Sequence, residues 1–242
     1  MNKIDVVMLT KNSQRWLEEC VRSVYANIPV NRLIVIDGYS TDGTLTILKK
    51  FDTKYGNVKI IQEFGTRGKA RNIGIREVET DWFMFVDSDV ILCDGWFNKA
   101  WNHVREDTGA VWGADIPGEI NNNFLRKVFQ CMETRVFAIR GGCQDTLIRY
   151  DAVKDIKIPE ELHTLEDAYI KEWILSKGFR VVVSFDAYCK HFKEIGNLVS
   201  RENRLATINE FKRMRYMQER MVYAAIFAAA WFAQEASRRR KN

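Results

Sequence analysis

Short apolar runs alternate with stretches of helical periodicity through the first 86 residues, and this alternation constrains the fold more than any other feature. The runs are short and bounded by polar residues, as buried parallel strands are: IDVVML 4–9, LIVID 33–37, VKIIQ 58–62 and WFMFV 82–86. Apolar residues recur at helical spacing between them, in residues 14–27, 41–55 (with Thr41 as N-cap) and 67–79. Repeated strand and helix predict an α/β protein with a Rossmann-like, mostly parallel sheet and helices on both faces.

The second half of the chain is less regular. It predicts strands at 111–116, 145–150 and 179–185 and helices at 124–138 and 164–177. A polar stretch, residues 117–123, is a candidate lid over a bound ligand. No internal repeat or low-complexity linker interrupts the chain, so we expect one domain over residues 1–197, followed by a helical tail, residues 198–242.

Positive charge is concentrated in the tail. The chain has a net charge of +5, yet residues 201–242 hold ten Lys or Arg against four Asp or Glu, and residues 1–200 hold 27 against 28. Nucleic-acid-binding domains carry a basic patch or stripe on the folded body. The neutral body of this chain therefore argues against nucleic acid as a partner.

The tail also contains thirteen apolar residues in a row, MVYAAIFAAAWFA 221–233, between basic flanks. A membrane-spanning helix needs about 20 apolar residues, so this run is too short to span. Two interpretations stay open: residues 201–242 lie on an anionic membrane surface, or they pack on their own domain or on a second subunit of a homo-oligomer. The five widely spaced cysteines and the lack of a signal sequence after Met1 predict a reducing, cytoplasmic location, peripheral to a membrane in the first case.

Two carboxylates follow the fourth expected strand directly, in FVDSDV 85–90. Asp87 and Asp89 lie on either side of Ser88, so their side chains point the same way if the strand continues. Carboxylates that close repel one another unless a cation lies between them, and Mg²⁺ or Mn²⁺ suits oxygen ligands and substrate phosphates. The pair is a candidate metal site, and a solvated acidic turn is the alternative.

Further polar residues lie where other expected strands end, which is the edge at which open α/β sheets bind ligands. Thr10 and Asp37 end the first two strands, and Asp37 indicates either nucleoside recognition or an Asx turn before a helix. His191 comes just after the last strand and is either a ligand or a structural histidine.

Charged residues begin two of the expected helices. Arg67, Lys69 and Arg71 follow glycines at a helix start, which indicates either phosphate binding or an ordinary basic helix face. Glu166 and Asp167 open another helix, where acids are favourable for the helix dipole alone.

In their order along the chain, these segments resemble the inverting glycosyltransferases of family 2, which have the GT-A fold. The resemblance covers roughly residues 3–192 and rests on six segments together, since none is specific alone: VVMLTKN, LIVIDGYSTDGT, GKARNIGI, FVDSD, GGCQDTLIRYDAV and LEDAYIKEWILSKGFRVVV. It implies a UDP- or GDP-linked sugar as donor, Mn²⁺ or Mg²⁺ on the diphosphate, and inverting transfer to an acceptor hydroxyl. A lipid-linked or membrane-proximal acceptor follows if the tail binds a membrane.

The resemblance also implies roles for matching residues. Six would bind the donor: Thr10 and Asp37 at the nucleoside, Lys69 and Arg71 at the diphosphate, and Asp87 and Ser88 at the ribose or the metal. Asp89 would ligate the metal, with Asp87 and His191 as further ligands. Asp167 would be the general base that deprotonates the acceptor.

The chain departs from the family pattern at three positions. Leu9 and Lys11 stand where a proline and a tyrosine are usual, and Gly38 replaces an aspartate that often helps to read the base, so the nucleotide stays open. The Gln/Glu-Arg pair of some polymerising members is not evident, which argues against a processive synthase. Two alternatives are a nucleotidyltransferase, although residues 9–14 lack its Gly-rich phosphate loop, and a non-catalytic, membrane-associated protein that binds nucleotide sugars.

Overall fold

The computed structural model describes residues 3–135, 142–163 and 165–192. The expected boundary at residue 197, the tail of residues 198–242, and the last three residues of the helix expected at 124–138 lie outside these described residues. The candidate site residues all lie within the described body of the chain.

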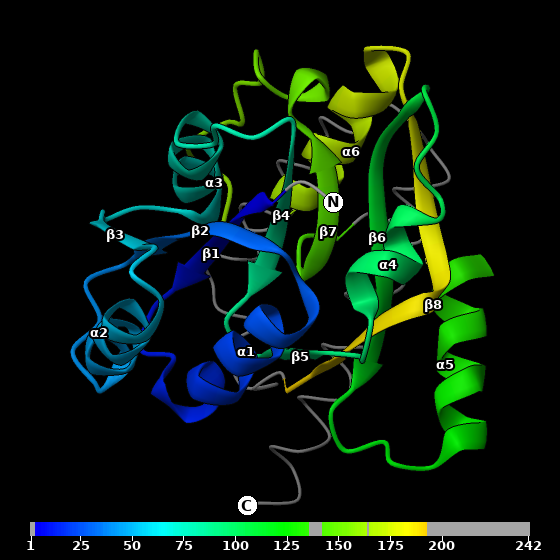
Figure 1. Cartoon of the computed structure of the whole chain (residues 1–242). Coiled ribbons are helices and arrows are strands. Elements are labelled where there is room, and N and C mark those ends of the chain that lie inside the picture. The colour runs from blue at the N-terminus through cyan, green and yellow to red at the C-terminus, as the bar shows by residue number, and fades with distance from the viewer. Residues whose placement is uncertain (1–2, 136–141, 164, 193–242) are drawn as a thin grey trace, which may run out of the picture.

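An eight-stranded sheet forms the centre of this body (Figure 1), in the order β3-β2-β1-β4-β7-β6-β8-β5. The strands are β1 Ile4–Thr10, β2 Val30–Asp37, β3 Val58–Gln62, β4 Trp82–Asp87, β5 Val90–Leu92, β6 Thr108–Pro117, β7 Asp145–Arg149 and β8 Arg180–His191. The first four in this order pair in parallel, which confirms the sheet expected from the first half of the sequence. The second half is mixed, because β7 pairs antiparallel with β4 and β6, β8 is parallel to β6, and β5 is antiparallel to β8.

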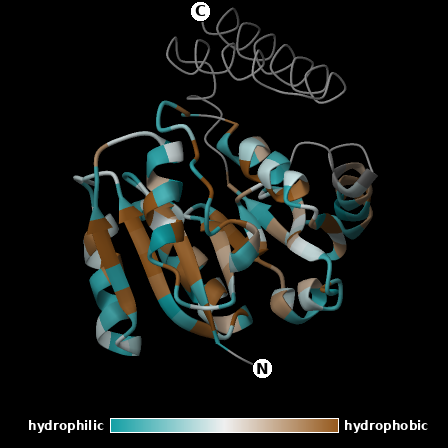
Figure 2. Cartoon of the chain, turned by 90° about the horizontal axis from the view of Figure 1, so that it is seen from above, coloured by the Kyte–Doolittle hydropathy of each residue, from teal (hydrophilic) through white to brown (hydrophobic). Residues whose placement is uncertain are grey.

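Helices cover both faces of the sheet, as the sequence predicts, and each face has its own hydrophobic core. The helices are α1 Gln14–Asn27, α2 Thr44–Tyr55, α3 Arg67–Arg76, α4 Trp96–Trp101, α5 Asn123–Arg135 and α6 Glu166–Ser176, with a short 3-10 turn at Tyr150–Ala152. One core joins α1, α2 and α4 to the sheet through residues such as Leu17, Leu48 and Trp96. The other joins α3 and α6 through residues such as Ile75 and Ile174. Figure 2 shows the resulting layers, with hydrophobic strands at the centre and hydrophilic surfaces on the surrounding helices.

Register brings the carboxyl ends of the parallel strands to one edge. Thr10 pairs with Asp37, and Asp37 pairs with Gln62. Leu9 pairs with Asp87, so β4 ends at the same level. The edge at which α/β sheets bind ligands therefore carries the polar residues that the sequence singled out.

Three local details differ from the sequence expectations. Helix α2 begins at Thr44 with Gly43 as N-cap, because the backbone of Thr41 bonds to Asn12 and the carboxylate of Asp42 accepts hydrogen bonds from Thr44. Strand β8 continues six residues past its expected end, so His191 is its last residue and does not follow it. Strand β5 and helix α4 are not predicted, since three and six residues are too few to show a period.

Candidate active site

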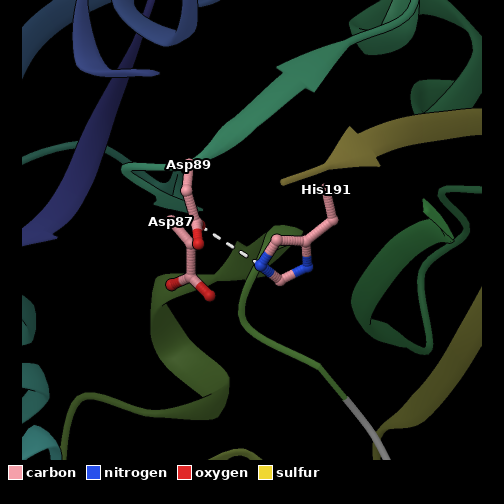
Figure 3. A group of neighbouring side chains, drawn as sticks. All are labelled: Asp87, Asp89 and His191. Atoms are coloured by element: carbon pink, nitrogen blue, oxygen red, sulfur yellow. Dashed lines mark ion pairs between the residues drawn. The ribbon is translucent and has the colours of Figure 1, made fainter. Parts of the chain in front are cut away.

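Asp87, Asp89 and His191 form a compact group at the carboxyl edge (Figure 3). Asp87 ends β4, Asp89 lies in the turn before β5, and His191 ends β8. One ligand atom from each residue can be chosen so that all lie within 4.8 Å of one another, and His191 Nε2 lies 3.2 Å from Asp89 Oδ1. Two hard oxygen ligands and one imidazole nitrogen on a partly exposed edge suit a divalent ion such as Mn²⁺ or Mg²⁺.

Asp115, which the sequence did not single out, lies behind the histidine. Its Oδ1 is 3.2 Å from His191 Nδ1, and both side chains are buried. A Nδ1–H that donates to Asp115 leaves the lone pair of Nε2 facing Asp89, which is the tautomer that metal-binding histidines use. The β6–β8 pairing sets Asp115 opposite Cys189, two residues from His191, and so fixes this contact.

Arg71 forms an ion pair with Asp87. Its Nη2 donates to Asp87 Oδ1 at 2.7 Å, and its guanidinium lies over the ring of Phe85, with the side chain only 2% exposed. Burial opposes ionisation of Asp87, but the charges of Arg71 and Arg67 and the hydrogen bond from Arg71 prevail and hold the pKa of that carboxyl below its usual value. Asp87 is therefore kept as a carboxylate.

Asp37 is the centre of a second polar group, beside the first. It is fully buried and accepts hydrogen bonds from Thr10 Oγ1 at 2.8 Å, from the backbone N–H of Ser40 at 2.8 Å and from Gln62 Nε2 at 3.2 Å. Burial disfavours its charge, but these bonds outweigh it and lower the pKa of Asp37. The sequence-predicted neighbours Thr10 and Asp37 are thus in direct contact.

Two exposed aromatic side chains border this group, and sequence reasoning missed them. Tyr39 and Phe64 stack with their ring centroids 4.0 Å apart, and they are 44% and 64% exposed. Tyr39 has a φ of 56°, a region that costs energy for a bulky residue. Its place inside the IDGYS turn is the only sequence signal that could have indicated it.

The two other cations of α3, Lys69 and Arg67, interact with different acidic groups. Lys69 Nζ donates to Glu63 Oε1 at 2.7 Å, so it lies with β3 and not with the Asp87 group. Arg67 is exposed, and the negative charges of Glu166, Asp87 and Asp167 raise the pKa of its guanidinium. Arg67 is therefore the α3 cation that interacts electrostatically with both Asp87 and the start of α6.

Asp167 and Glu166 occupy different environments at that helix start. Asp167 is partly exposed, and its Oδ1 accepts a hydrogen bond from the backbone N–H of Ala168 at 2.8 Å. Glu166 is buried, and burial together with the charge of Asp167 raises the pKa of Glu166 to about 7, against the opposing charges of Arg67 and Arg71. Ser88, by contrast, points toward the loop after β1, where its Oγ lies 2.9 Å from Ser13 Oγ.

The raised pKa of Glu166 makes stability depend on pH. The folded-state pKa lies above the unfolded value of 4.5, so this group contributes most stability below pH 4.5 and loses it as the pH rises through 7. Relative to Glu166→Gln, the free energy of unfolding of the wild type should fall by about 3 kcal/mol between pH 4.5 and pH 8. Urea unfolding across this range measures the difference, with Glu106→Gln on the exposed α4–β6 turn as control. Parallel curves for wild type and Glu166→Gln would contradict the assignment.

The fold and this edge together define a class: a GT-A-type α/β protein with an acid–histidine group where its parallel strands end. The model of glycosyl transferase family 2 matches residues 5–153, and the chain belongs to that family. The family and the class of enzyme expected from the sequence, a family 2 glycosyltransferase, are thereby confirmed, in preference to a nucleotidyltransferase.

Relatives by sequence include a protein named for teichoic acid biosynthesis and a poly(ribitol-phosphate) glycosyltransferase. The chain is 28% identical over 190 residues to the minor teichoic acid biosynthesis protein GgaB of Bacillus subtilis, covering 71% of this chain and 21% of that protein. It is 28% identical over 180 residues to the poly(ribitol-phosphate) beta-N-acetylglucosaminyltransferase TarS of Staphylococcus aureus, covering 69% of this chain and 31% of that protein. The chain thus spans only about a fifth to a third of the length of these relatives.

Solved structures share the fold. A crystal structure of S. aureus TarS 1–349 with UDP-GlcNAc superposes with a TM-score of 0.63 at 22% identity, covering 90% of this chain and 68% of that one. The mannosyltransferase PcManGT of Pyrobaculum calidifontis with GDP-Man and Mn²⁺ gives 0.62 at 16% identity, covering 87% and 61%. These likenesses confirm the expected GT-A fold.

Within the described residues, no helix has both the length and the apolar character needed to cross a membrane.

Proposed function

We propose that this chain transfers a sugar from a nucleotide-diphosphate sugar to an acceptor hydroxyl, with inversion at the anomeric carbon and with a divalent cation at Asp87, Asp89 and His191. The observation that carries the proposal is the convergence of these three ligand atoms within 4.8 Å at the carboxyl edge. TarS, solved with UDP-GlcNAc, and PcManGT, solved with GDP-Man and Mn²⁺, give support as relatives in fold.

The nucleoside of the donor would bind over β1 and β2. Asp37 is held ionised by Thr10 and Ser40, and because it is fully buried, it would act on the ribose or the base by orienting the partly exposed Ser40. The stacked rings of Tyr39 and Phe64 offer an aromatic surface beside it. Since Gly38 carries no side chain to read the base, the choice between UDP and GDP donors rests on experiment.

The diphosphate would lie between the Asp87 group and Arg67. When bound, a divalent cation would supply positive charge that neutralises the departing diphosphate. Arg67 would add a charge from α3, whereas Arg71 serves by holding Asp87 in place at 2.7 Å. Lys69, paired with Glu63, would reach the diphosphate only after leaving that partner.

Asp167 would take the proton from the acceptor hydroxyl. It stands at the start of α6 and is partly exposed, and its charge acts on Arg67, as the charge of Asp87 does. A base there, across the sugar from the leaving group, supports in-line displacement and inversion. Residues 117–123, which lead from the end of β6 to the start of α5, would lie over the donor as the lid considered above.

A thermal-shift panel tests the proposal. With Mn²⁺, one or more of UDP-GlcNAc, UDP-glucose and GDP-mannose should raise the unfolding temperature, and EDTA should abolish the shift, because a ligand that binds only the native state stabilises it. Transfer or slow hydrolysis of the same donor, measured by nucleotide release, should accompany binding. No shift with any donor would contradict the donor assignment, and binding without turnover would favour the non-catalytic alternative.

A further inference from the structure

Helix α5 turns its apolar side away from its own domain. Phe124, Leu125, Val128 and Met132 lie on one face at helical spacing and are 74%, 47%, 38% and 38% exposed. We call these four residues the α5 stripe. Helix α5 stands at the outer edge of β6 and β8 (Figure 1).

The polar side of the same helix packs inward. Gln130 is only 2% exposed, and its Nε2 donates to the backbone carbonyl of Phe185 in β8 at 2.7 Å. The guanidinium of Arg126 lies over the ring of Tyr188, also in β8, at 4.9 Å from its centroid. A surface helix normally buries its apolar face, so this reversed arrangement marks a contact site for another apolar phase.

We infer that the α5 stripe is a membrane-contact surface that binds an anionic lipid bilayer. Charge supports lipid as the partner. Lys127 is exposed on α5 next to Val128 of the stripe, and residues 201–242 hold ten basic residues against four acidic ones. Cations that flank an apolar helix face are attracted to anionic headgroups while the apolar residues enter the acyl boundary.

The size of the stripe argues against a second copy of this chain as the partner. A helix of 13 residues is about 20 Å long, and a face about 10 Å wide gives about 200 Å². A stable interface between proteins buries about 800 Å² on each partner. A bilayer accepts a small apolar patch, provided that a second attachment adds to it.

The point at which the described chain ends supplies that second attachment. The backbone N–H of Gly118 donates to the carbonyl of His191 at 2.9 Å, and Lys190 Nζ donates to Asn121 Oδ1 at 2.7 Å. The start of α5 therefore lies beside the end of β8, from which the basic tail with its apolar run 221–233 continues. Contact through α5 would also bring the Asp87 group close to the lipid surface, where a lipid-linked acceptor would lie.

Vesicle co-sedimentation of the full chain tests the inference. The wild type should bind vesicles that contain phosphatidylglycerol, and Phe124→Ala/Leu125→Ala should lower the partition coefficient at least about tenfold. Val128→Lys should lower it too, although it adds a positive charge. Tyr55→Ala, which removes a 40% exposed aromatic residue from α2, should bind as the wild type does. Circular dichroism and nucleotide-sugar binding should be the same in all four proteins, because the altered side chains are exposed.

Four outcomes would overturn the inference. Wild type that stays in solution with anionic vesicles would refute it, as would stripe variants that bind unchanged through the tail alone. Stronger binding by Val128→Lys would show attraction by charge without insertion of the stripe. A dimer in sedimentation velocity that Phe124→Ala/Leu125→Ala dissociates, without lipid binding by the wild type, would assign the stripe to a second copy instead. None of these results bears on turnover, so the proposed reaction is tested separately.

Discussion

Asp167→Asn is expected to lower the rate of sugar transfer about 1,000-fold while leaving donor affinity within about twofold of the wild type. Removal of a positioned general base costs about 10²- to 10⁴-fold, because the acceptor hydroxyl must then lose its proton without help. Asp167 makes one hydrogen bond within its own helix, to the N–H of Ala168, which an asparagine oxygen can also accept. The fold and the donor site should therefore survive, and kcat should fall with little change in the donor KM.

Two further measurements separate this role from a structural one. Glu106→Gln, on an exposed turn away from the carboxyl edge, should leave the rate unchanged. Slow hydrolysis of the donor should fall less than transfer. Water does not occupy the acceptor position as the acceptor hydroxyl does, so its attack depends less on a base positioned there. Full turnover by Asp167→Asn would remove Asp167 from the base role, and loss of donor binding would assign it to the donor site.

Asp89→Ala is expected to weaken Mn²⁺ binding about 100-fold and to abolish transfer at Mn²⁺ concentrations that saturate the wild type. The substitution removes one of the two carboxylates of the three-residue group, the one whose Oδ1 lies 3.2 Å from His191 Nε2. Mn²⁺ affinity, measured by the loss of the free-ion EPR signal, reports the site without reference to turnover.

Asp115→Asn provides a graded comparison at the same site. The residue holds His191 Nδ1 and does not belong to the three-residue group, so the expected loss of Mn²⁺ affinity is about 10-fold, the lower part of the range for groups that orient a ligand. Asp186→Asn, an exposed acid elsewhere in β8, should leave the affinity unchanged. Equal affinity in the wild type and Asp89→Ala would place the cation elsewhere.

The parallel half of the fold could be predicted from sequence because buried parallel strands are continuous apolar runs. Residues 33–37 and 82–86 show this pattern: the first range ends in an acid, Asp37, and the second is followed directly by one, Asp87. Local sequence therefore located Asp37 and Asp87, and strand order brought them to one edge. The orientation of β7, by contrast, depends on pairing with β4, which is more than 50 residues away, and no periodicity reports it.

Residues whose roles depend on long-range pairing could not be predicted. In the sequence, Asp115 is one polar residue inside an apolar strand. Only the pairing of β6 with β8 shows that it lies next to His191. Asp145 is similar: it is buried beneath the site, accepts a hydrogen bond from Trp96 Nε1 at 2.9 Å, and has a pKa raised well above its usual value by burial. Gly113 makes room for it, since a Cβ there would lie 2.0 Å from Asp145 Oδ2. Arg71, which was expected at the diphosphate, donates a hydrogen bond to Asp87, a contact that local sequence does not report.

Anomalous diffraction from a crystal soaked with MnCl₂ and UDP or GDP tests the central claim most directly. The account predicts a manganese peak within about 2.5 Å of Asp89 and His191 Nε2, with the pyrophosphate oxygens on its open side and the nucleoside over Asp37. A nucleotide bound at another edge of the sheet, with no manganese between Asp89 and His191, would contradict it.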